Sequence, residues 1–340
     1  MPLLTKEAIE EGPNAGGTGL LFLLAIAAGS ALGISAPGAA ERVAGATDIT
    51  LLILIFLLFF ELRLSAVARA FGNLKFLAVA WSANFLIVPT IAFAIASLLL
   101  PGKPLLFAGL MIYFLAPCTD WFLGFTRMAG GDTELGAALI PVNLISQLLL
   151  FPLWLWLFTP VTGLVDFAAM PALFLQWFVL PMALAQCARV VLTRLLPPQA
   201  MERLFARAGL LMSLTLCLLI AQIFASHVGE ILSHAALFGV VAIAVLLFFA
   251  LTFGAGHALA RLAALSHPQH ALLAMTMAAR NAPLMLALTA VALPDQPLVL
   301  AVIVFGMLVE IPHLTLLRQL LVRRSPQASE ARHVLRPNEL

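Results

Sequence analysis

The stretch FLAPCTDWFLGFTRMAGGDTE, residues 114–134, opens as apolar sequence suited to a membrane helix and then changes character. Pro117, Cys118 and Asp120 fall within four residues, so a helix-breaking residue lies beside a thiol and a carboxylate. Proline removes one backbone donor and leaves a carbonyl without its partner. In lipid, such groups persist only where they face protein or a water-filled cavity. The stretch therefore predicts a broken membrane helix next to a polar site.

The rest of the chain has the composition of an integral membrane protein. Of its 340 residues, 63% are hydrophobic and only 10% are charged, and the mean hydropathy is +1.08. A helix needs about 20 apolar residues to cross a hydrocarbon core about 30 Å thick. Ten apolar runs of this kind recur, at 18–36, 47–64, 76–100, 105–126, 135–158, 172–193, 208–226, 232–256, 271–293 and 297–320. Because the runs are continuous rather than alternating, they predict an all-α polytopic membrane protein and not a barrel.

The basic residues predict how these helices are oriented. Of the 18 Lys and Arg residues, Arg42 and Lys103 fall on one side of a ten-helix arrangement, Arg280 falls inside a span, and the other 15 fall on the side of the termini. Loops rich in Lys and Arg are cytoplasmic. We therefore expect both termini in the cytoplasm and the protein in the plasma (inner) membrane. The net charge of +2 follows from this topology, so no nucleic-acid partner is expected.

The longest basic connection, residues 194–207, predicts a cytoplasmic linker after the segment 18–193. The last helix of that segment, 172–193, opens the second half, so the first five-helix repeat is 18–158 and the second comprises 172–193 and 208–322. Residues 1–17 and 323–340 are the expected cytoplasmic ends. An odd number of helices per half forces the second half to enter the membrane from the opposite side, so homologous halves form an inverted repeat.

Polar, proline-broken segments occur in the fourth span of each half, at Pro117-Cys118-Thr119-Asp120 and at Arg280-Asn281-Ala282-Pro283. Matching interruptions of this kind point to a transporter's substrate site. Asn143 and Gln147 are four residues apart and share a helix face. The candidate substrate-binding residues are therefore Cys118, Thr119, Asp120, Asn143, Gln147, Arg280 and Asn281, with Pro117 and Pro283 as the helix breaks. The alternative is that each proline is an ordinary packing kink.

Buried charge marks the same region. Asp120, Arg280 and Glu310 lie within expected spans, where an ionised group costs about 2.5–3.5 kcal/mol on insertion scales. Each should face a partner or a transport pathway, and Glu310 is the candidate proton-coupling residue. The alternative is a structural ion pair between Arg280 and Glu310 that locks two helices. Cys118 beside a helix break is a candidate ligand for a thiophilic cargo, whereas a membrane cysteine is usually a small hydrophobic residue.

Several function classes are not expected. The sequence holds no H-E-x-x-H, G-x-S-x-G or P-loop motif, so we expect no enzyme, no catalytic residues, no cofactor and no resident metal. The few charges inside the spans favour a discrete site over a lined channel. The expected partners are a small-molecule or ion substrate and membrane lipid, and a homo-oligomer is left open.

The assembled motifs resemble those of the bile acid:sodium symporter superfamily. Within it, they are most similar to those of the arsenite efflux permeases. The stretch LAPCTDWFLGFTRMAGGDTELGAALIPVNLISQLLLFPL is similar to that group's Ala-Pro-Cys-Thr signature, Gly-Asp turn and asparagine-bearing helix, and WSANFLIVP and LVEIPHL are similar to its third and tenth helices. The positions that carry the resemblance are Asn84, Phe85, Pro89, Cys118, Asp132, Asn143, Glu310 and Pro312. It spans about residues 60–320.

The resemblance implies ten helices in two inverted five-helix repeats, with broken helices 4 and 9 crossing near the substrate. It also implies that Cys118 is a soft ligand and Glu310 a proton site. Asp120 departs from the arsenite group, which usually has a small apolar residue there, and AARNAPLMLAL resembles the symporter type more. Thr276 and Arg280 fall where sodium-coupled members carry a glutamate and a glutamine, which disfavours sodium because hard cations need oxygen donors.

Two functions remain open from the sequence. One is proton-coupled efflux of arsenite or a related metalloid by alternating access, motivated by Cys118 and Glu310. The other is transport of an organic anion, like a bile acid, held by the positive charge of Arg280.

Overall fold

The computed structural model describes residues 15–62, 71–119, 121–158, 172 and 175–323. Most of the expected N-terminal segment 1–17 and nearly all of the tail 323–340 lie outside the described residues. Asp120, a predicted substrate-binding residue, lies outside them as well.

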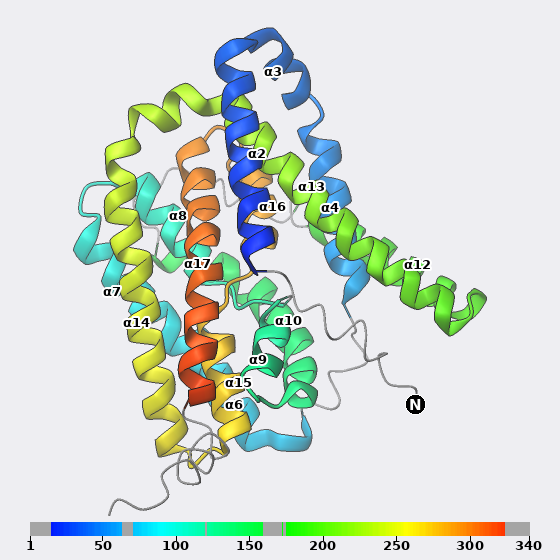
Figure 1. Cartoon of the computed structure of the whole chain (residues 1–340), viewed down its shortest axis with the longest axis vertical. Coiled ribbons are helices and arrows are strands. Elements are labelled where there is room, and N and C mark those ends of the chain that lie inside the picture. Colours follow the sequence, from blue (N-terminus) through cyan, green and yellow to red (C-terminus); the bar gives the residue numbers. More distant parts are fainter. Residues whose placement is uncertain (1–14, 63–70, 120, 159–171, 173–174, 324–340) are drawn as a thin grey trace, which may run out of the picture.

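Every regular element in these described ranges is helical (Figure 1). The helices, with short 3-10 and π-helical turns labelled η, are α2 Ala15–Ser35, α3 Pro37–Ala44, α4 Thr47–Glu61, η2 Phe71–Asn73, α6 Leu74–Ser82, η3 Ala83–Ile87, α7 Val88–Leu99, α8 Pro104–Phe114, α9 Phe122–Met128, α10 Thr133–Phe158, η4 Leu175–Val179, α12 Leu180–Leu195, α13 Pro198–Ser233, η5 Ala235–Leu237, α14 Phe238–Leu262, α15 His267–Ala278, α16 Ala282–Ala292 and α17 Pro297–Arg323. The all-α prediction is confirmed.

Six helices of the described part are long and apolar enough to cross a membrane. They are Leu74–Leu99, Thr133–Leu150, Leu175–Leu195, Pro198–Ser233, Ala235–Leu262 and Pro297–Val322. The pair α3 and α4, bent by 44°, makes a seventh if it is one span. The chain is therefore a multi-pass membrane protein, whereas ten spans in two inverted repeats stay a prediction.

Two of the expected spans fall short of this length because each is divided into two helices. The expected span 105–126 is divided into α8 and α9, and the expected span 271–293 into α15 and α16. At 1.5 Å per residue, the 11-residue helices α8 and α16 are each about 16 Å long, roughly half of the hydrocarbon core. Both divisions fall where the sequence predicts a break.

The expected linker, residues 194–207, is mostly helical. Helix α12 ends at Leu195 and α13 begins at Pro198. Proline at the first helical position has the correct φ and lacks an N–H that would be unpaired there, so it starts a helix readily. The basic composition indicated a connection, but only Leu196 and Pro197 separate the two helices.

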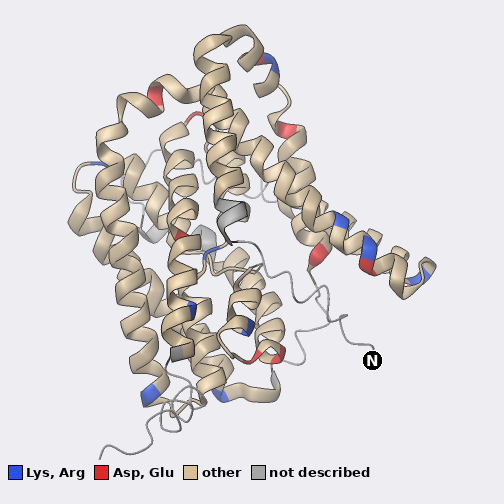
Figure 2. Cartoon of the chain, in the orientation of Figure 1, with Lys and Arg blue, Asp and Glu red and all other residues tan. Residues whose placement is uncertain are grey.

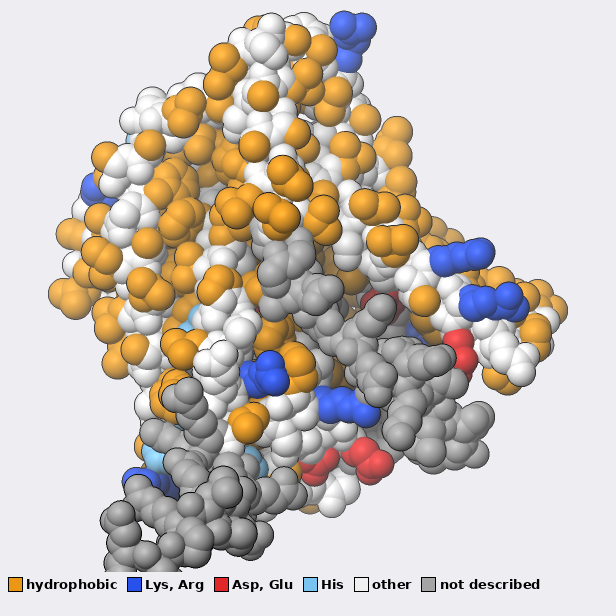
Figure 3. All heavy atoms as spheres, in the orientation of Figure 1, with side chains coloured by type: hydrophobic (Ala, Val, Ile, Leu, Met, Phe, Trp, Pro, Cys, Tyr) orange, Lys and Arg blue, Asp and Glu red, His pale blue; other side chains and the backbone are white. Residues whose placement is uncertain are grey.

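The outer surface carries large apolar side chains and few charges. Exposed leucines and isoleucines lie on α2, α13 and α14, among them Leu20, Leu24, Leu210, Leu214, Ile243 and Leu246. Figure 3 shows hydrophobic atoms spread over one face of the molecule, and Figure 2 shows charged residues mainly toward the helix ends. A soluble monomer rarely exposes so large an apolar surface, which fits contact with lipid.

Helices α2 and α13 approach each other at small residues. A Cβ added at Gly29 would clash with the backbone carbonyl of Ala221, and one at Gly33 with that of Ala225. Two glycines four residues apart allow this close packing, which is how membrane helices associate without a hydrophobic driving force.

We expect Gly33→Leu to destabilise the protein, because the new side chain has no space against Ala225 and overpacking costs about 1–3 kcal/mol. The measurement is the apparent Tm of purified protein in detergent. Gly254→Leu on α14 is the matched control, since nothing lies within 4 Å of a Cβ added there. Equal Tm values for the two variants would contradict the packing.

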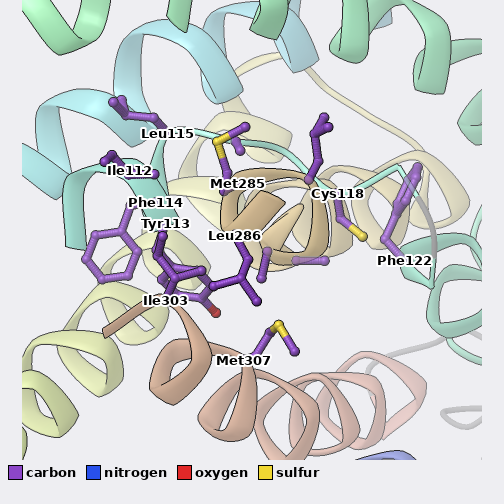
Figure 4. Packing of buried hydrophobic residues seen from close by; sticks show 14 of the residues in the cluster. Ile112, Tyr113, Phe114, Leu115, Cys118, Phe122, Met285, Leu286, Ile303 and Met307 are labelled. Atoms are coloured by element: carbon purple, nitrogen blue, oxygen red, sulfur yellow. The ribbon is translucent and has the colours of Figure 1, made fainter. Parts of the chain in front are cut away.

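Helix α17 lies at the centre of the fold and packs against α8, α13, α14 and α16. Figure 4 shows side chains of α8, α16 and α17 pointing toward one another, including Tyr113, Leu286 and Met307. All three are fully buried. Gly306 lets α17 approach α8 closely, because a Cβ there would lie 2.6 Å from the Tyr113 ring. This contact places α17 beside both helix breaks.

Candidate functional site

The two breaks cross and bond to each other through their backbones. The Cys118 N–H donates to the Ala279 carbonyl at 3.1 Å, and the Asn281 N–H donates to the Ala116 carbonyl at 2.9 Å. Pro117 and Arg280 form the antiparallel bridge between these bonds. Backbone groups that lose their partners inside each helix are thus satisfied across the crossing, as the membrane interior requires.

Local sequence explains where the breaks fall. Pro117 lies in the first break, between α8 and α9, and has no N–H to continue α8. Pro283 lies in the first turn of α16, and the second break, Ala279–Asn281, directly precedes that helix. A proline ring clashes with the carbonyl four residues earlier, here that of Ala279. That carbonyl turns away and accepts from Cys118 instead.

Side chains join the two breaks as well. The Asn281 amide Nδ2 donates to Thr119 Oγ1 at 3.0 Å, and its Oδ1 accepts from the Leu284 N–H at 3.4 Å, capping α16. Cys118 and Asn281 are fully buried. The predicted residues Cys118, Thr119, Arg280 and Asn281 therefore meet at one place.

Glu310 reaches this crossing from α17. Its Oε2 lies 2.8 Å from the Tyr113 hydroxyl, and its Oε1 accepts from Trp121 Nε1 at 2.9 Å and from the Arg280 backbone N–H at 3.0 Å. The carboxyl group is fully buried. One side chain thus contacts α8 and both breaks, so a change in its charge or position acts on three elements.

The Arg280 guanidinium binds backbone carbonyls. Its Nη1 donates to the Phe114 carbonyl at 2.8 Å, and its Nη2 donates to the carbonyls of Thr276 and Met277 at 2.7 and 2.8 Å. From the sequence, Arg280 was expected to pair with Glu310 or to bind an organic anion. In the structure, Glu310 accepts a hydrogen bond from the backbone N–H of Arg280. Three hydrogen bonds of the guanidinium go to backbone carbonyls, so this group is poorly placed to hold an organic anion.

A second polar group lies beside the crossing, around Thr276 in α15. Asn84 and Asn143 donate to Thr276 Oγ1 at 3.0 and 3.2 Å. Gln147 Nε2 lies 3.8 Å from the Met285 sulfur in α16. The predicted pair Asn143 and Gln147 thus faces α15 and α16.

Three buried amide oxygens in this group, Asn84 Oδ1, Asn143 Oδ1 and Gln147 Oε1, have no hydrogen-bond partner within the described structure. Buried polar atoms are usually paired, so unpaired acceptors are expected where water or a ligand hydroxyl binds. The group therefore offers acceptors without offering charge.

Three residues of the site were not among the predicted ones. Tyr113 and Trp121 hold Glu310, and Asn84 holds Thr276. Tyr113 is the only tyrosine in the chain and lies in an apolar span, where a lone hydroxyl needs a partner. Asn84 falls in a π-helical turn, η3, ahead of Pro89, and such turns are frequent at functional sites. The lone tyrosine is visible in the sequence, whereas the π-helical turn is seen only in the structure.

Comparison with known proteins identifies the fold family. The model of the Sodium Bile acid symporter family matches residues 48–248. The chain belongs to this family. The matched region contains the first break with Cys118, while Arg280 and Glu310 lie beyond it.

The chain is also 29% identical, over 150 residues, to the arsenical-resistance protein Acr3 of Corynebacterium glutamicum. The aligned part covers 42% of this chain and 40% of that protein. The match thus spans less than half of that protein's length.

Proposed function

We propose that this protein is a membrane transporter that exports arsenite, or a related trivalent metalloid, in exchange for protons. The observation that carries the proposal is the crossing of the two breaks. The Ala279 carbonyl accepts a hydrogen bond from the Cys118 N–H, and the N–H of the next residue, Arg280, donates to the carboxyl group of Glu310. A cysteine and a carboxyl group therefore contact two consecutive residues of the second break. Thiols bind soft metal and metalloid centres, and a buried carboxyl group can carry a proton.

The neighbouring polar group supports a neutral hydroxylated cargo. Arsenite is an uncharged trihydroxide near neutral pH, and its hydroxyls need acceptors. The unpaired oxygens of Asn84, Asn143 and Gln147 offer acceptors without a charge. The similarity to an arsenical-resistance protein agrees with this chemistry.

The proposed transport cycle is alternating access in a ten-helix fold of two inverted five-helix repeats, 18–158 and 172–322. The breaks between α8 and α9 and between α15 and α16 then occupy the fourth span of each repeat, where such transporters bind their cargo. Both termini and residues 194–207 lie on the cytoplasmic side of the plasma membrane. The excess of Lys and Arg on that side supports this orientation.

Everted membrane vesicles from an arsenite-sensitive bacterial host test the proposal. With the vesicle interior acidified, vesicles containing the protein should accumulate radiolabelled arsenite, and an ionophore that collapses the pH gradient should stop the uptake. The same host should grow at higher arsenite concentrations when it expresses the protein. Absence of uptake, or uptake that persists without the gradient, would count against proton-coupled export.

A further inference from the structure

Arg280 lies between the C-terminal ends of two half-helices. Phe114 is the last residue of α8, and Thr276 and Met277 belong to the last turn of α15. The guanidinium donates to the carbonyls of all three, at 2.7–2.8 Å. It thus bonds one broken helix to the other from within the protein.

The charges of this arrangement balance. The C-terminal end of a helix carries roughly −0.5 elementary charge, so two such ends together carry roughly −1. The guanidinium supplies +1, is fully buried, and also lies 5.7 Å from the centre of the Phe248 ring. The carboxyl group of Glu310 makes its hydrogen bonds to Tyr113, Trp121 and the backbone N–H of Arg280, so the hydrogen bonds of the guanidinium go to the helix ends.

Half-helix C-termini and unwound carbonyls are also the groups with which secondary transporters bind a coupling cation. Here Arg280 uses the Phe114, Thr276 and Met277 carbonyls, and the Thr276 hydroxyl oxygen accepts from Asn84 and Asn143. A soluble cation at this place would lose these acceptors and would meet a fixed positive charge.

We propose that Arg280 is a tethered cation that takes the place of a bound monovalent cation between α8 and α15. The protein therefore changes between its inward-facing and outward-facing states without binding and releasing sodium. Transport without sodium rests on the proposed function, in which the proton at Glu310 is the coupling ion. The replacement of a bound cation by Arg280 rests on the geometry of Arg280 alone.

The first test measures the thermal stability of the purified wild-type protein and needs no cargo. We expect the same apparent Tm in sodium, potassium and choline chloride at equal ionic strength, because a ligand raises Tm only if the folded state binds it. A Tm that rises specifically with sodium would overturn the proposal, whatever the result of the arsenite experiment.

The second test removes the tethered charge. Arg280→Ala should lower the Tm, and millimolar guanidinium should raise the Tm of this variant by about 2–4 °C, while urea, a neutral molecule of the same shape, should not. Guanidinium should leave the wild-type Tm unchanged. Equal effects of guanidinium and urea on the variant would show that Arg280 only fills space and would overturn the proposal.

Conservative variants keep the test decisive if Arg280→Ala does not fold. Arg280→Lys retains the charge and Arg280→Met retains most of the length, so Lys should be the more stable of the two. A Met variant as stable as the wild type would contradict a role for the charge. Sodium-dependent arsenite uptake by the wild type would overturn the inference while leaving arsenite as the cargo.

Discussion

Glu310→Gln is expected to reduce arsenite uptake driven by a pH gradient by about 100-fold, the lower end of what a positioned proton-transfer group contributes. Glutamine has nearly the shape of glutamate, and its amide oxygen can still accept from Trp121 and the Arg280 N–H. It cannot take up and release a proton. The variant should therefore fold but fail to couple cargo to protons.

Exchange of labelled for unlabelled arsenite across the membrane separates coupling from folding, because it needs no net proton movement. We expect Glu310→Gln to retain this exchange while losing gradient-driven uptake. Tyr113→Phe, which removes a hydroxyl that lies 2.8 Å from Glu310 and 3.0 Å from the Gly306 carbonyl, should have a much smaller effect, about fivefold for a hydrogen bond worth ~1 kcal/mol. Equal loss of exchange and uptake in Glu310→Gln would indicate a structural role instead.

Cys118→Ser is expected to weaken arsenite binding at least about tenfold, which corresponds to ~1.4 kcal/mol. Serine has nearly the size of cysteine, and its backbone N–H can still donate to Ala279, so the crossing should remain intact. What is lost is the sulfur that a trivalent arsenic centre prefers. The measurement is equilibrium binding of radiolabelled arsenite to the purified protein.

Cys187 provides the matched control. It lies on α12 with its side chain exposed on the outer surface, whereas Cys118 is fully buried at the crossing. Cys187→Ser should bind arsenite like the wild type. Unchanged binding by Cys118→Ser, or an equal loss in both variants, would remove Cys118 from the cargo site.

The features that depend on composition and on single residues were predictable from the sequence. Lipid leaves helices as the main way to satisfy the backbone, so continuous apolar runs predict an all-α protein. Pro117 and Pro283 beside polar residues predict interrupted helices, because proline has the same effect on a helix wherever it lies. In the structure, α8 ends at Phe114 and α9 begins at Phe122, and the second interruption, between α15 and α16, is at 279–281.

The partners of Arg280 were not predictable in the same way. A buried guanidinium needs acceptors, and Glu310 was the most evident one in the sequence. The carbonyls of Phe114 and Thr276 become available only because two helices end there and meet in space. Tyr113 and Trp121 were overlooked for a similar reason, since aromatic residues in apolar segments are usually packing residues until a buried carboxyl group is placed beside them.

The central claim is that cargo binds where the two breaks cross, with Cys118 as a ligand. Anomalous diffraction at the arsenic absorption edge, from crystals of the protein grown with arsenite, tests it most directly. We predict one dominant arsenic peak within bonding distance of Cys118 Sγ, between the first break and α16. A dominant peak elsewhere in the protein, or none at Cys118 when the crystals contain arsenite at saturating concentration, would contradict the account.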